Sequence, residues 1–152
     1  MTAKKILVVY YSKTGNTKKV AEKISKFLKT DIEQIIDKTD RSGIKGWLIG
    51  GRDAMKKKYT KIIFKKNPYE YDLVIIGTPT WAWTLTPAIR TYLKKNKKIK
   101  KVAFFGTNGG APGKTFSQME KLSKKPIAVL SINEKNIISS DINIKNFCDK
   151  LK

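Results

Sequence analysis

Histidine is absent from this 152-residue sequence, and cysteine occurs once, at Cys148. Without histidine the chain cannot build a Ser–His or Cys–His catalytic pair, and most types of zinc site are excluded. A single cysteine forms no intramolecular disulfide and no cysteine metal cluster. Because Cys148 follows Phe147 in an expected C-terminal helix, we predict that it is a small buried apolar residue rather than a redox thiol.

Acidic residues and arginine are scarce, whereas lysine is abundant. Twelve acidic residues stand against 33 basic ones, only three of which are arginine, and the formal net charge is +21. The lysines occur in every segment, and arginine, which suits bidentate phosphate and base contacts, is rare. We therefore expect solvated lysine faces rather than a nucleic-acid site, and a charge that attracts acidic partner proteins.

Long hydrophobic runs are also missing. The longest uncharged stretch, residues 73–89, is interrupted by Pro79, Pro87 and several threonines, so it does not resemble a membrane span. The apolar run near the N-terminus is short and shows no cleavage signature. We expect one domain over residues 1–152 in a soluble, cytoplasmic protein without a membrane partner.

Short apolar runs alternate with amphipathic segments along the chain. Apolar side chains at helical spacing, such as Val20, Ile24 and Leu28, predict helices between the runs. Thr86 and Pro87 are typical of the N-cap and first position of a helix. Buried strands separated by helices indicate an α/β fold with a parallel sheet, whose ligands bind beyond the carboxyl ends of its strands. The predicted strands are residues 6–10, 32–36, 73–76, 102–105 and 127–130.

The segment 38–64 has a less regular pattern. Several glycines surround Trp47 and are followed by Ala54, Met55 and a lysine run. This order predicts a glycine-rich connection followed by a short helix. We expect Trp47 to pack on the domain. The alternative is that it covers the edge of a ligand or a partner.

The stretch Ser12-Lys13-Thr14-Gly15-Asn16-Thr17 follows the first predicted strand and precedes the first predicted helix. Exposed N–H groups at the start of a helix, together with the helix dipole, favour an anion. Hydroxyl and amide side chains surround a glycine that permits a tight backbone turn. The stretch therefore predicts a phosphate-binding turn, and an ordinary capped strand–helix turn is the alternative.

Two further loops follow the third and fourth predicted strands. Residues 77–84 carry Trp81 and Trp83, and large rings in a loop are typical of a planar ligand site, although rings folded onto the core are the alternative. Residues 106–113 are glycine-rich, which lets a backbone approach a ligand closely; a flexible loop without a role is the alternative.

Together the three loops resemble the flavodoxin family over nearly the whole chain. The first resembles the family's FMN phosphate loop, a strand followed by S-x-T-G-x-T, and Thr80-Trp81 resembles the pair that contacts the flavin ring. The resemblance implies a three-layer α/β flavodoxin-like fold with a five-stranded parallel sheet in the order 2-1-3-4-5. It also implies FMN as the cofactor of a protein that shuttles electrons between redox partners, with no catalytic side chain and no metal. The lysine-rich charge predicts that these partners are acidic.

The resemblance also implies individual roles. Hydroxyls, the Asn16 amide and backbone N–H groups of the first loop would hold the phosphate, while Lys13 would point to solvent. Trp81 would stack on one flavin face, and the backbone of the third loop would meet the pyrimidine edge of the ring. The implied cofactor-binding residues are Ser12, Lys13, Thr14, Gly15, Asn16, Thr17, Pro79, Thr80, Trp81, Ala82, Trp83, Thr107, Asn108, Gly109 and Gly110.

The sequence departs from the family pattern at two places. Ala82 stands where short-chain flavodoxins commonly have glycine, and a side chain makes a positive φ costlier. The third loop carries no tyrosine or tryptophan to cover the second flavin face, so that face is either open to a substrate or covered by another aromatic such as Trp47 or Trp83. An open face leaves an NAD(P)H-dependent FMN or quinone reductase as the second hypothesis, and a nucleic-acid-binding module is the third.

Overall fold

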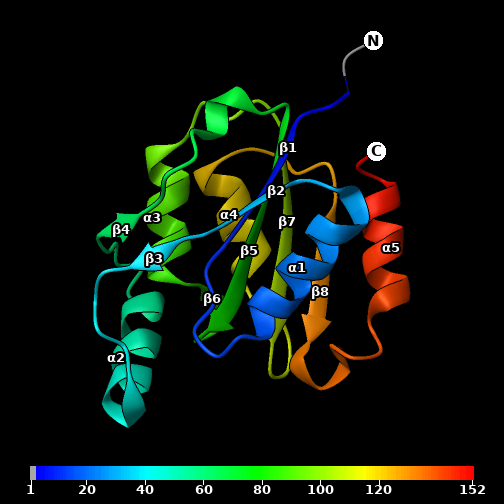
Figure 1. Cartoon of the computed structure of the whole chain (residues 1–152). Coiled ribbons are helices and arrows are strands. Elements are labelled where there is room, and N and C mark those ends of the chain that lie inside the picture. The colour runs from blue at the N-terminus through cyan, green and yellow to red at the C-terminus, as the bar shows by residue number, and fades with distance from the viewer. Residues whose placement is uncertain (1–2) are drawn as a thin grey trace.

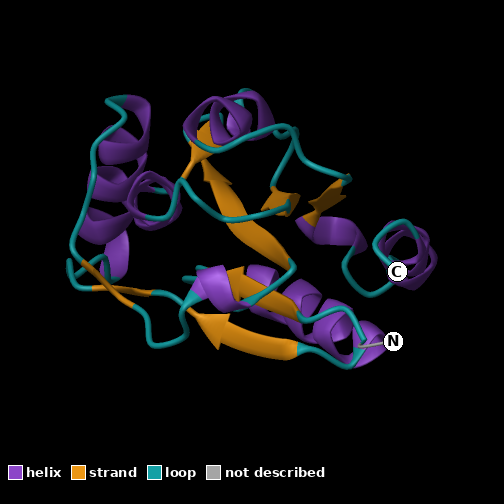
Figure 2. Cartoon of the chain, turned by 90° about the horizontal axis from the view of Figure 1, so that it is seen from above, coloured by secondary structure: helices purple, strands orange, loops and turns teal. Residues whose placement is uncertain are grey.

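A central β-sheet lies between two layers of helices in the computed structural model, which describes residues 3–152 (Figures 1 and 2). The five main strands pair in parallel, and their carboxyl ends meet at the lower edge of the sheet in Figure 1. Across the sheet they are β2 (Asp31–Gln34), β1 (Ile6–Tyr10), β5 (Leu73–Trp81), β7 (Val102–Asn108) and β8 (Val129–Asn133).

Each face of the sheet carries its own hydrophobic core, because successive side chains of a strand point to opposite faces. On β1, Val8 packs with the core beneath α1 and α5, whereas Val9 packs with the core beneath α3 and α4. Both valines are fully buried, as expected for a strand covered on both sides. The covering helices are α1 (Asn16–Leu28), α5 (Asp141–Asp149), α3 (Pro87–Lys95) and α4 (Thr115–Leu122).

The three-layer α/β class is confirmed, but the sheet is not the purely parallel five-stranded sheet that the resemblance implied. A sixth strand, β6 (Thr84–Leu85), pairs antiparallel with the end of β5. The strands β3 (Ile36–Asp37) and β4 (Ile62–Ile63) form a separate two-stranded sheet. The observed order is therefore β2-β1-β5-β7-β8. The apolar pattern did not predict β4 and β6, and β3 takes up the last residue of the predicted strand 32–36.

Two predicted loops begin later than the sequence indicated. β5 continues to Trp81 and β7 continues to Asn108, so residues 77–81 and 106–108 are strand rather than loop. The two extensions pair with each other, with Thr78 opposite Gly106. Threonine suits a pleated surface, and this pairing satisfies backbone groups that a loop would leave exposed.

The second predicted strand, residues 32–36, is divided in two at Ile35. Its N–H group donates to the Tyr10 carbonyl at 2.7 Å, and its side chain is fully buried. After this residue the chain leaves β1 and pairs with β4 instead. The bend carries the chain toward α2 (Gly43–Met55).

The predicted glycine-rich connection in segment 38–64 is wrong, because the glycines lie inside α2. A Cβ atom on Gly46 would lie 2.0 Å from the backbone carbonyl carbon of Arg41, and one on Gly50 would lie 2.9 Å from the Trp81 ring. Glycine is thus required at both positions for close helix packing. In Figure 1, α2 stands at the carboxyl edge of the sheet, to its left.

Two short 3-10 helices, Pro68–Glu70 and Glu134–Asn136, complete the described elements. Cys148 is fully buried in α5, as predicted, and burial raises the pKa of its thiol to about 11. In residues 3–152, no helix has the length and apolar character that crossing a membrane requires.

Candidate functional site

The candidate site lies where the chain reverses its direction across the sheet. From β1 the chain crosses to β2 at one edge, whereas from β5 it proceeds to β7 and β8 in the opposite direction. The carboxyl ends of β1 and β5 are therefore neighbours whose following segments diverge, which is the usual position of a ligand crevice in such sheets. The turn Ser12–Thr17, the β5–β6 hairpin and the end of β7 meet at this place.

The turn Ser12–Thr17 is ordered by its own first hydroxyl. Ser12 Oγ accepts hydrogen bonds from the N–H groups of Gly15 at 3.1 Å and Lys18 at 3.2 Å. Gly15 has a φ of 97°, which a glycine adopts without steric cost, and α1 begins at the next residue. The first N–H groups of α1, at Asn16 and Thr17, have no partner inside the helix by geometry and suit an anion.

Thr17 and Thr107 join this turn to the end of β7. Their hydroxyl oxygens lie 2.7 Å apart, and both residues are buried. The resemblance assigned Thr17 to the phosphate, and in the structure its hydroxyl contacts Thr107. This contact fixes the first turn of α1 against the central strand.

Asn108, the next residue of β7, has an unsatisfied acceptor. Its Nδ2 atom donates to Ser131 Oγ at 3.1 Å, whereas its buried Oδ1 atom has no hydrogen-bond partner within residues 3–152. A buried acceptor without a donor is costly, so this atom fits a ligand that brings an N–H or O–H group. Gly109 and Gly110 follow as exposed residues, with open space where a Cβ atom would lie.

The β5–β6 hairpin turns at Ala82 and Trp83, which both have positive φ values, 50° and 65°. A two-residue hairpin turn of type I′ requires this conformation and normally uses Asn-Gly. The chain therefore adopts at Ala82 the costly conformation that glycine would make easy. Trp83 O accepts from Lys114 N at 2.7 Å, and Gly113 leaves room for this approach.

Replacing Trp83 with glycine should relieve this turn. We expect the free energy of unfolding to rise by about 0.5 to 1 kcal/mol. The left-handed conformation costs a non-glycine residue about 1 to 2 kcal/mol, but glycine loses more chain entropy on folding, which offsets part of this gain. Trp83 is 64% exposed, so little packing is lost. Urea denaturation measures the change; Trp83→Ala keeps the strain, and an equal gain in that variant would contradict the explanation.

The buried Arg90 helps to hold the β5–β6 hairpin in place. Arg90 Nη2 donates to Gln118 Oε1 at 2.7 Å, and Thr84 Oγ1 donates to the same oxygen at 2.8 Å. Burial lowers the pKa of Arg90. Since Gln118 belongs to α4 and Thr84 to β6, these bonds tie the hairpin to the helical layer.

Trp81 is held between three neighbours. Its ring meets the Tyr11 ring edge-to-face at a centroid distance of 5.6 Å, and the Arg41 guanidinium lies 5.8 Å from its centroid. Gly50 of α2 touches its six-membered ring. Burial raises the pKa of Tyr11 to about 12, so this phenol stays neutral. Trp81 is therefore a rigid wall of the site, whereas Trp83 is exposed.

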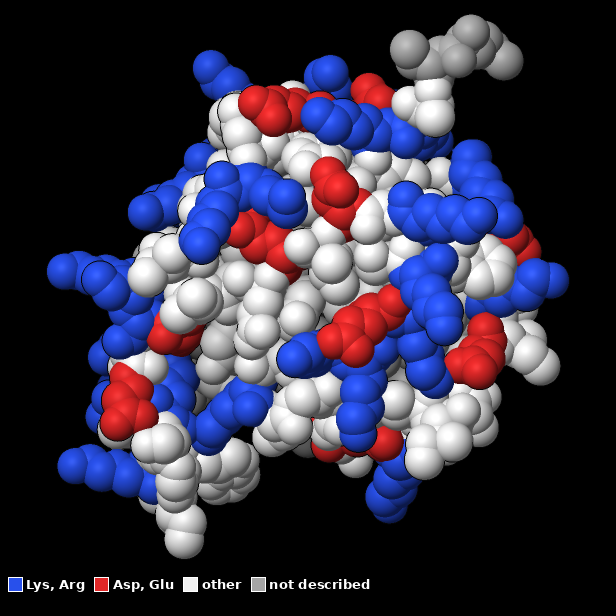
Figure 3. Space-filling view, viewed as in Figure 1, with Lys and Arg blue, Asp and Glu red and all other residues white. Residues whose placement is uncertain are grey.

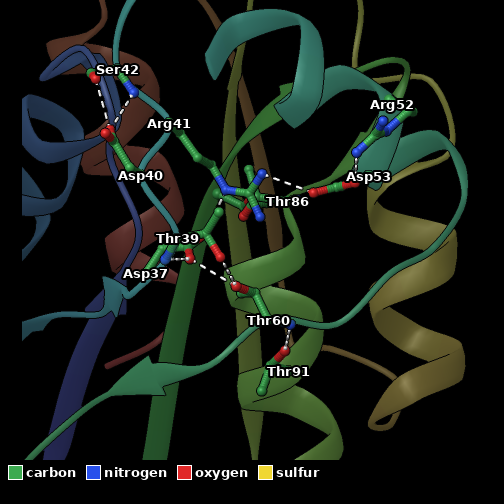
Figure 4. Close-up of polar contacts among 11 residues, drawn as sticks. Asp37, Thr39, Asp40, Arg41, Ser42, Arg52, Asp53, Thr60, Thr86 and Thr91 are labelled. Carbon is green, nitrogen blue, oxygen red and sulfur yellow. Dashed lines mark hydrogen bonds and ion pairs between the residues drawn. The ribbon is translucent and has the colours of Figure 1, made fainter. Parts of the chain in front are cut away.

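Arg41 forms a buried ion cluster that the sequence analysis missed (Figure 4). Its Nε atom donates to Asp37 Oδ2 at 2.7 Å, and its Nη1 atom donates to Asp53 Oδ2 at 3.0 Å. Burial lowers the pKa of Arg41, but the bonds to Asp37 and Asp53 outweigh it and raise the pKa overall. Thr60 Oγ1 also donates to Asp37 Oδ1 at 2.8 Å. The cluster joins β3, α2 and the Trp81 wall.

A cavity of about 420 Å³ lies between α2 and the hairpin. Trp47 lines it and is 68% exposed, so the expectation that Trp47 packs on the domain is wrong. Lys13 is half-buried and also lines the cavity rather than pointing away into solvent. The complete lining is Lys13, Gly46, Trp47, Leu48, Gly50, Gly51, Arg52, Met55, Thr80, Trp81 and Ala82.

The structure thus divides the fifteen implied cofactor residues into groups. One group lines the cavity: Lys13, Thr80, Trp81 and Ala82. Thr17, Thr107 and Asn108 are buried around the end of β7, and Pro79 is buried within β5. The remainder lie on the surface or partly exposed at the same sheet edge: Ser12, Thr14, Gly15, Asn16, Trp83, Gly109 and Gly110.

Known proteins resemble this chain in sequence and in fold. The model of the flavodoxin family matches residues 5–150. A flavoprotein from Lactobacillus acidophilus, crystallised with FMN, is 27% identical over 91% of this chain and 98% of its own, with a TM-score of 0.72. A protein assigned as a flavoprotein from Bacteroides eggerthii is also 27% identical, over 92% and 98%, with a TM-score of 0.73.

A third structure, assigned as a flavoprotein from Bacteroides uniformis, has a TM-score of 0.80 over 97% of this chain and 99% of its own. At 19% identity, this likeness shows the fold alone. A search of curated protein sequences finds no significant match.

Proposed function

Because the chain belongs to the flavodoxin family, we propose that it binds FMN and carries electrons between redox partners. The observation that carries this proposal is the ordered turn Ser12–Thr17 at the switch point of the sheet, beside the braced Trp81 wall. Such a turn suits the phosphate of a ligand whose planar part reaches the ends of β5 and β7. The FMN complex of the similar Lactobacillus acidophilus protein supports the same cofactor.

The residues present fit this cofactor. The turn would hold the phosphate through N–H groups of the first α1 turn, and Asn108 Oδ1 offers the ring a buried acceptor that lacks a donor within the described chain. Gly109 and Gly110 leave the backbone open to close approach. FMN, when bound, supplies the electron-transfer chemistry, while the protein binds, orients and excludes water.

The lysine surface supports an acidic redox partner. Basic side chains are spread over the visible face of the molecule in Figure 3, between uncharged areas and fewer acidic side chains, and the net charge is +21. This charge favours fast, weak encounters with acidic proteins at low salt. It also favours the anionic, fully reduced cofactor, so we expect a less negative second potential than in an acidic flavodoxin.

Titration of the purified apoprotein with FMN and with riboflavin tests the proposal. We expect FMN to quench tryptophan emission and to bind at least about tenfold more tightly than riboflavin, because only FMN carries the phosphate. Gly15→Ala should weaken FMN binding about tenfold and leave riboflavin binding unchanged, since an L-residue is strained at a φ of 97°. Equal affinities for both flavins would contradict the phosphate turn.

A reductase is the second candidate, because one observation favours it. Gly109, Gly110 and Ala111 are exposed, and no aromatic side chain of this loop covers the adjacent surface. A second planar reactant could stack on a flavin there. Steady-state oxidation of NADPH by the FMN-loaded protein separates the candidates: a pure carrier shows none without a partner.

A further inference from the structure

The α2 helix exposes a stripe of large apolar side chains on its outer side. Ile44, Leu48 and Met55 lie four and seven residues apart, which places them on one helix face, and Trp47 lies next to them. Ile44 is 81% exposed, and the other three also leave more than half of their surface in solvent. We call these four residues the apolar stripe. Apolar side chains gathered on one exposed face mark an interaction surface.

The other side of α2 holds the helix on the domain. Gly46 and Gly50 allow close approach to Arg41 and Trp81, and Asp53 pairs with Arg41. These contacts involve none of the four residues of the apolar stripe. The stripe is therefore not required for packing α2 against the rest of the chain.

The apolar stripe extends beyond the cavity that adjoins the proposed FMN site. Trp47, Leu48 and Met55 reach that cavity, but Ile44 does not line it. A ligand in the cavity would leave Ile44 in solvent, so the cofactor does not account for the whole stripe. In Figure 1, α2 extends past the carboxyl edge of the sheet, at the lower left, with its outer side away from the other helices.

Exposed basic residues form a row beside the apolar stripe: Lys45, Arg52, Lys56, Lys57 and Lys58. The first three are seven and four residues apart, so they share one side of the helix and its C-cap. Asp53, the only acidic residue in segment 41–63, is buried and bonded to Arg41, and the nearest other acidic residue along the chain, Asp40, precedes the helix. Figure 3 shows uncharged side chains projecting at this end of the molecule, with basic side chains close by.

An apolar row and a basic row side by side on an exposed helix fit an anionic lipid surface. Apolar side chains of such a helix enter the boundary between headgroups and acyl chains, while its cations pair with anionic headgroups. Tryptophan is enriched at this boundary. A second copy of the chain would bring one basic row close to another, and a folded acidic protein would need a groove that matches a projecting helix. A deformable lipid surface meets neither difficulty.

We propose that α2 binds the surface of an anionic lipid membrane, with the apolar stripe in the headgroup layer and the basic row on the lipid headgroups. The sequence analysis expected no membrane partner, because the stripe exists only once segment 43–55 is a helix. This binding requires no FMN, so it goes beyond the proposed function. It would bring the carboxyl edge of the sheet to the membrane surface.

Flotation of the full chain with vesicles tests the proposal. We expect the protein to float with vesicles of phosphatidylcholine and phosphatidylglycerol in equal parts, and to stay behind with vesicles of phosphatidylcholine alone. Ile44→Ser combined with Leu48→Ser should weaken binding at least about tenfold, because these side chains no longer bury apolar surface in the lipid. Ile138→Ser combined with Ile142→Ser is the matched control, since these isoleucines are 93% and 73% exposed but lie at the start of α5.

Paired lysine variants separate the basic row from the general charge of the molecule. Lys45→Gln combined with Lys56→Gln should weaken binding at least about tenfold, because lysines at an anionic lipid surface contribute directly to binding. Lys97→Gln combined with Lys98→Gln removes the same charge between α3 and β7 and should weaken binding about twofold or less. Anionic vesicles should also shift tryptophan emission to shorter wavelength, and Trp47→Phe should remove most of this shift.

Four results would overturn the proposal. The first is a failure to float with the anionic vesicles. The second is an equal loss in the Ile44→Ser/Leu48→Ser variant and its control, which would reduce the binding to general charge attraction. The third is a concentration-dependent dimer in sedimentation that this variant abolishes, which would assign the stripe to a second copy. The fourth is binding to polyglutamate, but not to vesicles, that is lost in the same variant, which would assign the stripe to an acidic protein.

Two controls accompany these measurements. Circular dichroism checks that each variant keeps the fold. Flotation is measured without added flavin and again after FMN treatment, so a failure to bind FMN does not affect the test of lipid binding.

Discussion

Replacing Arg41 with methionine is expected to lower the free energy of unfolding by about 3 to 5 kcal/mol. The variant leaves the buried Asp37 carboxylate without a cation and leaves Asp53 with only the more exposed Arg52 and Lys58, and an uncompensated buried charge carries a penalty of this size. Arg41 also lies over Trp81, so we expect a shift in tryptophan emission as this wall loosens. Urea denaturation followed by circular dichroism measures the stability change.

Arg52→Met is the matched control for this prediction. Arg52 lies on the same helix and is 3.6 Å from Asp53 Oδ1, but its side chain is 54% exposed. Exposed ion pairs contribute about 0 to 1 kcal/mol because water screens them. If Arg41→Met cost no more than Arg52→Met, the buried cluster would not anchor α2.

Replacing Gly46 with alanine is expected to lower the free energy of unfolding by about 1 to 3 kcal/mol. The added Cβ atom would lie 2.0 Å from the backbone carbonyl carbon of Arg41, and backbone atoms cannot turn aside as a side chain can. α2 must then move away from the chain that carries the ion cluster. Thermal and urea denaturation both report this change.

Gly51→Ala provides the contrast in the same helix. No atom lies within 4 Å of its added Cβ, so alanine brings only its better helix propensity. We expect a gain of about 0.5 to 1 kcal/mol. Destabilisation by both substitutions to the same extent would show that close packing at Gly46 is not the cause.

Local patterns predicted much of this molecule because their physics is local. Continuous apolar runs identified β1, β5 and β7, which are buried on both faces along most of their length, whereas β8 begins two residues later than predicted and is buried on one face. Thr86-Pro87 marked the start of α3. The turn Ser12–Thr17 was predicted between a strand and a helix because glycine, hydroxyl and helix-start chemistry act over a few residues. The neighbouring strand ends then followed from the rule for parallel sheets.

The helix α2 was not predicted from such local patterns. Four glycines within nine residues, from Gly43 to Gly51, lower helix propensity and indicate a loop. Tertiary packing reverses that preference, because glycine at two of these positions lets the helix contact Arg41 and Trp81. Helix propensity therefore predicts poorly where close packing of a helix requires a glycine, which has no side chain.

The ion cluster around Arg41 could not be predicted from the spacing of its residues in the sequence. Asp37 and Arg41 are four residues apart, but Asp53 lies on another element and Trp81 comes forty residues after Arg41. The strained hairpin was only partly indicated: the resemblance placed a common glycine position at Ala82, but nothing in the sequence predicts the positive φ at Trp83. Both features exist because distant segments impose them.

The sequence by itself determined the class of fold, the strand–turn–helix at Ser12–Thr17 and the resemblance to flavodoxins, because each depends on periodicity or on contiguous residues. Only the tertiary structure decided that α2 is a helix, that Arg41 is buried between two carboxylates, and that an apolar cavity opens beside Trp81. The reason is physical: burial, close approach and charge pairing are set by contacts between residues far apart in the chain.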